Sequence, residues 1–271
     1  MTDLSTNPVR LGLVGLGYWG VKIAEAAAVS PEIQITRCFA RTPSTREAFA
    51  AKYDCRPASS YQQMLEDDSL EGVILITPNQ VHRDQILQAV EHGKHIFVDK
   101  PLKAGLVLGV DHECRREPAL RKMKQMLDQG ALGRPLMTDA NISSSTGLRT
   151  RPDEWRAAAG ECPGGPLIQI GIHHIDSLQY LLGPIVRVQG WQKRQVLQIP
   201  MDDTTVTLLE FENGMLGYLG SGYASAWASW IYVYGDRAIG KYSRNEGLSV
   251  AGEPAVGSPE EWQAPGASYA D

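Results

Sequence analysis

A glycine turn between a short apolar run and a helical segment constrains the fold of this chain more than any other feature. Residues 9–14 (VRLGLV) are too few for a helix and are typical of a buried parallel strand. Gly15, Gly17 and Gly20 follow with GxGxxG spacing, and residues 21–29 have helical composition. Between a strand and a helix, such glycines allow a tight turn, close approach of a pyrophosphate and close helix packing. The sequence predicts a dinucleotide-binding turn; the alternative is a glycine turn that serves packing alone.

Strand-like and helix-like segments alternate through the first 118 residues. Further strands are expected at 33–39, 72–77 and 94–98, and helices at 44–53, 60–65 and 81–92. Ser60 is a candidate N-cap for the short helix, and Gly93 is expected to end the last one. Alternation of this kind predicts a right-handed, doubly wound parallel sheet in a first domain, residues 1–118.

After about residue 118 the pattern changes to helices followed by strands. Helices are expected at 118–129 and in the second half of 166–182, and strands at 186–188, 204–211, 215–219 and 230–234. Asn213-Gly214 lies between two of these strands and predicts a tight hairpin. Residues 119–271 are therefore expected to form an α+β domain with a large, mostly antiparallel open sheet, frayed after Gly252.

Charge and cysteine content exclude several classes of protein. The 271 residues carry a net charge of −5 and no basic run, which argues against a nucleic-acid or membrane partner. The four cysteines have no CxxC spacing, which favours free thiols in a reducing cytosol over disulfides or a zinc site; they are Cys38, Cys55, Cys114 and Cys162. No apolar stretch approaches the ~20 residues that span a bilayer, and no signal peptide is visible. We expect a soluble, cytoplasmic protein.

The residues after the second expected strand indicate which dinucleotide binds. An acidic residue there would bind the ribose 2′-hydroxyl of NAD, but the segment reads CFARTPS and contains none. Arg41 can pair with a 2′-phosphate, and Ser44 and Arg46 can add hydrogen-bond donors. The sequence favours NADP, with NAD and a merely solvated Arg41 as the alternatives.

Two further strand ends carry candidate functional residues. Thr77, Pro78 and Asn79 form a stiff polar turn suited to a ribose or nicotinamide, followed by His82, which either joins that site or faces solvent. Lys100 ends the apolar run at 95–98, and in an open α/β sheet the ligand crevice lies outside the carboxyl ends of the strands. A lysine there is expected to reach a substrate oxygen.

Four motifs together resemble the Gfo/Idh/MocA oxidoreductase family. They are residues 11–20 with Tyr18 and Trp19 in the glycine turn, Thr77-Pro78-Asn79-x-x-His82, Asp99-Lys100-Pro101-Leu102, and Gly164-Gly165-Pro166-x-x-x-x-Gly171-x-His173-x-x-Asp176. The resemblance implies a Rossmann domain followed by an α/β domain whose open sheet carries subunit contacts. It also implies hydride transfer between NAD(P) and a secondary alcohol of a sugar, inositol or cyclic diol. A homodimer or homotetramer through the C-terminal sheet is expected, although aromatic residues there such as Trp230 are equally suited to a core.

The same resemblance assigns the catalytic residues. Lys100 matches the lysine of the family's Glu-Lys-Pro motif, with Asp99 in place of the glutamate. His173 matches the family histidine, and Gln169 stands where the family has an aspartate. A glutamine can hydrogen-bond a substrate hydroxyl but cannot accept a proton. Proton transfer is therefore expected to depend on Lys100 and His173.

Two residues near this motif are candidate substrate or positioning groups. Asp176, one helical turn after His173, is expected to orient it or to face the Rossmann domain. Arg156 either touches substrate or is solvated. His174 is expected to point away from His173, so this adjacent pair is not expected to bind a metal.

The sequence departs from the family pattern after Lys100. Only residues 101–105 separate it from the apolar run at 106–110, where relatives have a helix. Five residues are too few for a parallel crossover, so the run is expected to pair antiparallel or leave the sheet, unless a segment is missing. Relatives also continue beyond the point where this sequence ends. The sequence thus favours a working dehydrogenase, with an impaired NADP-binding paralogue, or a decarboxylating or eliminating enzyme, as alternatives.

Overall fold

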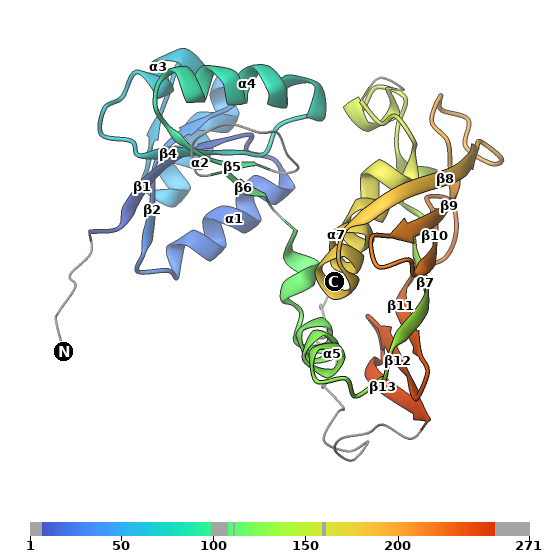
Figure 1. Ribbon diagram of the computed structural model, residues 1–271. Helices are drawn as coiled ribbons and strands as arrows, with labels where there is room; N and C mark the ends of the chain where they lie inside the picture. The colour runs from blue at the N-terminus through green and yellow to red at the C-terminus, as the bar shows by residue number, and fades with distance from the viewer. Residues whose placement is uncertain (1–6, 99–107, 111, 159–160, 253–271) are drawn as a thin grey trace, which may run out of the picture. The chain divides into compact units, whose positions relative to one another are not determined.

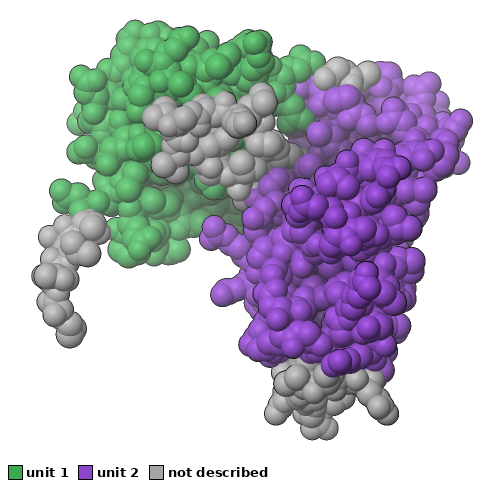
Figure 2. Space-filling model, viewed as in Figure 1, with its two compact units in different colours: residues 1–111 green, residues 112–271 purple. Residues whose placement is uncertain are grey.

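The computed structural model describes residues 7–98, 108–110, 112–158 and 161–252. The chain divides into two compact units, residues 1–111 and 112–271 (Figure 2). Because each unit has its own sheet and its own apolar core, each is described separately below.

The first unit is a parallel sheet of six strands in the order β3-β2-β1-β4-β5-β6 (Figure 1). Its elements are β1 (Val9–Val14), α1 (Tyr18–Ala28), β2 (Ile33–Phe39), α2 (Pro43–Tyr53), β3 (Arg56–Pro57), α3 (Tyr61–Leu65), β4 (Gly72–Leu75), α4 (Asn79–Glu91), β5 (His95–Val98) and β6 (Leu108–Val110). Leu13 and Val14 are both buried but pack in different apolar clusters, because successive strand residues point to opposite faces. The sheet is therefore covered on both sides, and the predicted doubly wound Rossmann fold is confirmed.

The pairing of the last strand corrects the expectation for residues 106–110. Strand β6 pairs parallel with β5, with Ile96 opposite Leu108 and Val98 opposite Val110. Antiparallel pairing and departure from the sheet are both wrong. Because both strands are short, the distance from the end of β5 to the start of β6 is small. It amounts to about two residues back along the strand direction and one inter-strand spacing of about 4.8 Å across the sheet. Nine residues can span about 30 Å, which exceeds this separation. These residues, 99–107, lie outside the described ranges.

The second unit has a mixed sheet of seven strands in the order β13-β12-β11-β7-β10-β9-β8. Its elements are η1 (Glu113–Arg116), α5 (Pro118–Asp128), β7 (Pro135–Ser143), α6 (Thr146–Arg149), η2 (Trp155–Ala157), η3 (Leu167–Gly171), α7 (Ile172–Leu182), β8 (Ile185–Lys193), β9 (Thr204–Phe211), β10 (Leu216–Gly222), β11 (Ala228–Gly235), β12 (Ala238–Ser243) and β13 (Gly247–Gly252). Its described pairs are antiparallel except β7 with β10, so the predicted mostly antiparallel sheet is confirmed.

Helices α5 and α7 cover one face of this sheet (Figure 1). Leu120 and Met123 of α5 and Leu178 of α7 form one apolar core with strand residues such as Leu219 and Ile231. None of the described helices is long and apolar enough to cross a membrane. The tail after Gly252, expected to fray, lies outside the described residues.

Candidate functional site

The glycine turn has the space that a dinucleotide requires. Gly15 has a φ of +94°, and a Cβ there would lie 2.1 Å from the Ile76 carbonyl oxygen. A Cβ on Gly20 would lie 2.2 Å from the Gly15 carbonyl oxygen. A Cβ on Gly17, in contrast, would have no described heavy atom within 4 Å. Packing therefore requires the outer two glycines, whereas the middle one borders open space where a pyrophosphate can approach the backbone.

At the start of α1, no side chain among the described residues caps the first backbone amides that border this space. Gly17 is the N-cap residue, it offers no side-chain hydrogen bond, and the first turn contains no acidic residue. Helix N-termini of this kind favour phosphate through their free N–H groups and positive dipole end. Tyr18 and Trp19 lie beside the turn, exposed, with their rings 5.3 Å apart in a T-shaped contact. These residues fit a bound dinucleotide.

The residues expected to bind the 2′-group of the dinucleotide's ribose lie at the end of β2 and the start of α2. The Arg46 guanidinium donates a hydrogen bond to the Ala40 carbonyl oxygen at 3.2 Å and so ties α2 to the end of β2. Arg41 and Ser44 are exposed, and no hydrogen bond or ion pair joins Arg41 to another described residue. Arg46 thus makes a structural contact, and Arg41 is an exposed cation at the end of β2.

The candidate residues in the turn after β4 differ in their contacts and in their burial. The Thr77 hydroxyl donates to Gln85 Oε1 at 2.5 Å, Pro78 occupies the N-cap position of α4 without a side-chain hydrogen bond, and Asn79 is the first residue of that helix. His82 is 5% exposed and lies on the buried face of α4 with Ile86. The alternative of a solvent-facing His82 is therefore wrong, because its position in the helix shares the core face. Asp99 and Lys100 lie outside the described residues.

In the second unit, His173 at the start of α7 meets residues of η1. Its Nδ1 lies 3.6 Å from Glu113 Oε2, and its ring makes a T-shaped contact with His112, 5.9 Å between centroids. The Ser177 hydroxyl donates to the His173 carbonyl oxygen, which fixes the first turn of α7. Sixty residues of sequence separate these groups, and the packing of η1 on α7 brings them together.

The neighbouring expected site residues have partners within the same unit. Gln169, in the π-helical turn before α7, donates its amide to the Cys162 sulfur. Asp176 is buried and accepts a hydrogen bond from Arg115 Nε at 2.7 Å. Arg156 is half-buried, with its guanidinium carbon 4.3 Å from the centre of the Trp155 ring.

His174 faces the sheet rather than η1. It is 2% exposed, and its Nε2 lies 3.4 Å from the Ser229 hydroxyl. Burial, followed by the nearby His173, lowers the pKa of His174 to about 3. This side chain is therefore neutral at physiological pH and belongs to the core.

Sequence reasoning missed the contribution of η1. Glu113, Cys114 and Arg115 belong to an uninterrupted polar run, residues 111–117, directly before the proline that begins α5. Such a run before a helix start is an available signal. From the sequence alone this polar run does not indicate a function, because its contact with His173 is visible only in the folded structure.

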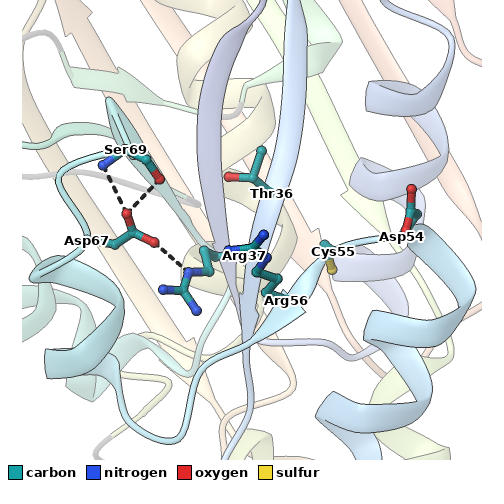
Figure 3. Close-up of a pocket in the computed structure, with 7 residues that line it drawn as sticks. All are labelled: Thr36, Arg37, Asp54, Cys55, Arg56, Asp67 and Ser69. Atoms are coloured by element: carbon teal, nitrogen blue, oxygen red, sulfur yellow. Dashed lines mark hydrogen bonds and ion pairs between the residues drawn. The ribbon is translucent and has the colours of Figure 1, made fainter.

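A cavity of about 410 Å³ lies elsewhere in the first unit (Figure 3). Its lining residues are Thr36, Arg37, Asp54, Cys55, Arg56, Asp67 and Ser69. Arg37 Nε lies 2.6 Å from Asp67 Oδ2, and Asp67 Oδ1 accepts hydrogen bonds from the Ser69 amide and hydroxyl. Arg37, Asp67 and Ser69 thus satisfy one another, and the described lining includes no residue of the glycine turn.

Two family models cover most of the chain. Residues 9–111 match the oxidoreductase family with an NAD-binding Rossmann fold, and residues 120–239 match the GFO/IDH/MocA C-terminal domain. A curated relative is the dTDP-3,4-didehydro-2,6-dideoxy-alpha-D-glucose 3-reductase of Saccharopolyspora spinosa. It is 26% identical over 95% of this chain and 78% of its own length.

Solved structures show the same likeness. A putative NADPH-dependent oxidoreductase from Desulfitobacterium hafniense superposes with a TM-score of 0.82 and 35% identity, over 88% of this chain and 73% of its own. A levoglucosan dehydrogenase in complex with NADH has a TM-score of 0.84 at 22% identity, over 92% of this chain and 77% of its own, which shows the shared fold. With both domain models matched in order, the chain belongs to the Gfo/Idh/MocA family of oxidoreductases with an NAD(P)-binding Rossmann fold.

Proposed function

We propose that this protein transfers a hydride between NADP(H) and a secondary alcohol or ketone of a sugar, inositol or cyclic diol. The observation that supports it most is the open space at Gly17, at the uncapped start of α1 in a family of NAD(P)-binding oxidoreductases. The carbohydrate class is supported by relatives such as the deoxysugar 3-reductase and levoglucosan dehydrogenase.

Cofactor binding is assigned to residues around the glycine turn. The backbone at Gly17 and the first amides of α1 would hold the pyrophosphate, and Arg41 with Ser44 would hold the 2′-phosphate. Thr77, Pro78 and Asn79 would border the ribose or nicotinamide. When bound, the nicotinamide supplies or accepts the hydride. NADP is preferred because the end of β2 offers the exposed cation Arg41 and no carboxylate.

Proton handling is assigned to Lys100 and His173. During oxidation the hydroxyl proton of the substrate passes to Lys100 as its O–H bond breaks and the carbonyl forms. His173, whose Nδ1 lies 3.6 Å from Glu113 Oε2, hydrogen-bonds the same oxygen or relays the proton. Gln169 would hydrogen-bond a substrate hydroxyl without taking its proton. In reduction the same groups return the proton.

Turnover of a substrate panel tests this proposal. We expect purified protein to change the absorbance of the reduced nicotinamide when given NADP or NADPH with sugars, inositols or cyclic polyols. Lys100→Ala is expected to lower kcat at least ~100-fold. Lys193→Ala removes an exposed lysine from the second unit and serves as the matched control. Tight NADPH binding without turnover across the panel would instead identify an impaired paralogue.

We also propose that a second copy of this chain covers the open face of the seven-stranded sheet. Leu208, Leu216 and Tyr218 lie on the side opposite the helices and are exposed, with Leu208 directly across from Tyr218. Tyr223 is buried and Trp227 exposed, so the aromatic residues of this region divide between core and surface. An apolar sheet face of this kind is typical of a subunit contact.

A further inference from the structure

Three side chains of the second unit have the donor atoms of a metal site. Glu113 and Cys114 lie on η1 and His173 lies at the start of α7. One ligand atom from each comes within 4.8 Å of the others. The sequence expectation of no metal site depended on CxxC spacing and on the His173–His174 pair. Neither of these sequence criteria detects a metal site whose ligands are distant in sequence and come together only in the folded chain.

The separations leave room for an ion between these side chains. Glu113 Oε2 is 3.6 Å from His173 Nδ1, and Glu113 Oε1 is 3.6 Å from Cys114 Sγ. An N–H···O hydrogen bond is about 2.7–3.2 Å. Ligands bound to tetrahedral zinc at about 2.0–2.3 Å lie about 3.3–3.8 Å from one another. The Glu113–His173 separation therefore has the length of one edge of a zinc tetrahedron, and the Cys114 thiol, which lies within hydrogen-bond distance of the other carboxylate oxygen, would exchange its proton for the ion.

The segment that carries two of these ligands is held on both sides. Arg115 Nε contacts Asp176 Oδ2 of α7 at 2.7 Å. Glu117, at the other end of η1, contacts Arg244 at 3.2 Å and accepts a hydrogen bond from Tyr242. The guanidinium groups of Arg115 and Arg244 thus each pair with a carboxylate outside the ligand set. The ligand set is preorganised by these contacts, which lowers the ordering cost of binding.

We infer that Glu113, Cys114 and His173 form a three-ligand site for a zinc or cobalt ion. Sulfur, imidazole and carboxylate donors are those that zinc prefers, and three protein ligands leave the fourth position open. The thiolate and carboxylate balance the charge of a divalent ion, and the Cys114 proton is released on binding. Because His173 is also the proposed proton-transfer residue, an ion here would inhibit turnover, a consequence that rests on the proposed function.

Cobalt spectroscopy on the full, reduced chain tests the site without cofactor or substrate. We expect one Co²⁺ per chain, with a thiolate-to-cobalt charge-transfer band that zinc abolishes by displacement. Cys114→Ser is expected to abolish the band, and Glu113→Gln to weaken Co²⁺ binding at least about 10-fold. Cys55→Ser, which removes a partly buried thiol from the first unit, is the matched control and should leave the band unchanged.

The outcomes separate this inference from the proposed function. A wild-type protein without the band, or a band that survives Cys114→Ser, overturns the metal site even if sugars are turned over. If Cys114→Ser fails to fold, unchanged Co²⁺ affinity in Glu113→Gln overturns it equally. A cobalt band in the metal-loaded protein, together with no turnover by the chelator-treated, metal-free protein, contradicts the dehydrogenase proposal and leaves the metal site supported.

Discussion

Gly17 and Gly20 lie three residues apart in the same turn, yet the space around their α-carbons differs. Gly17→Ala adds a methyl group to open space at an ordinary φ of −78°, so we expect an unchanged or slightly raised Tm. The same methyl group occupies the approach to the backbone, so NADPH affinity should fall at least about 10-fold (about 1.4 kcal/mol). Thermal denaturation and fluorescence titration of NADPH measure the two effects.

Gly20→Ala is the comparison variant for this turn. Its Cβ would meet the Gly15 carbonyl oxygen at 2.2 Å, so we expect a loss of about 1–3 kcal/mol in the free energy of unfolding. Equal NADPH affinity in wild-type protein and Gly17→Ala would contradict pyrophosphate binding at this turn.

Arg41 determines the preference between the two dinucleotides if it binds the 2′-phosphate. Arg41→Ala removes a charge-assisted hydrogen bond worth about 1.5–3 kcal/mol, so the Kd for NADPH should rise at least about 10-fold while that for NADH stays constant. Arg56→Ala, another exposed arginine of the first unit, is the matched control. Parallel losses for both dinucleotides, or no loss, would reject this role for Arg41.

At the scale of elements, the Arg115–Asp176 pair holds η1 against α7. Asp176 is almost fully buried, whereas the Arg115 side chain is 45% exposed, so solvent screens part of the interaction. We expect Asp176→Asn to lower the free energy of unfolding by about 1–2 kcal/mol, less than for a fully buried pair. Chemical denaturation measures the change. Asp153→Asn, which breaks the exposed contact with Arg151, should have little effect.

Asp67 links the loop after α3 to β2 and gives a predicted acid sensitivity. Hydrogen bonds from the Ser69 hydroxyl first, and then from Arg37, lower the pKa of Asp67 to about 2. Because the folded-state pKa lies below the unfolded value near 3.9, this stabilisation is present above pH 4 and is lost as the pH falls toward 2. Ser69→Ala should therefore move the acid-unfolding midpoint upward, as followed by circular dichroism. Ser249→Ala, an exposed serine, should leave the midpoint unchanged.

Elements with strong local signals could be predicted from the sequence. The Ser60 hydroxyl accepts a hydrogen bond from the Gln63 amide, and Gly214 adopts a φ of +82° in the β9–β10 hairpin. Strand β7 was missed because it begins with proline and contains Asp139 and Asn141, which disfavour strands locally. The position of β7 in the sheet is determined by its pairing with β10 and β11, which lie far from it in the sequence.

The site was predicted to a smaller extent than the fold. The glycine turn is a local motif, so its geometry follows from the residues of one βαβ unit. The surroundings of His173 depend on Glu113 and His112, which reach it only through packing of η1 on α7. His82 was ambiguous because a single helical position near a helix start does not show which face the sheet covers.

For the whole molecule, assembly through the open sheet face predicts an oligomer in solution. Light scattering after size exclusion should give a mass of two or four chains, and Leu216→Asp should reduce it by placing a charge on the apolar face. Val29→Asp, at an exposed position of the first unit, is the control and should keep the wild-type mass. A monomeric wild-type chain at micromolar concentration would contradict the proposed contact.

The central position of β7 has a consequence for synthesis on the ribosome. Both partners of this strand, β10 and β11, are translated after it, and β11 ends at Gly235. In the first sheet, apart from its short edge strands, the last pairing partner of each strand is translated within about sixty residues of that strand. Strand β7, in contrast, leaves the ribosome with both edges unpaired, and nearly a hundred further residues are translated before β11 is complete. Such nonlocal pairing is slow and leaves strand edges open to other chains. We expect nascent chains arrested before β11 to aggregate or bind chaperones through residues 135–143, while the Rossmann unit is already folded.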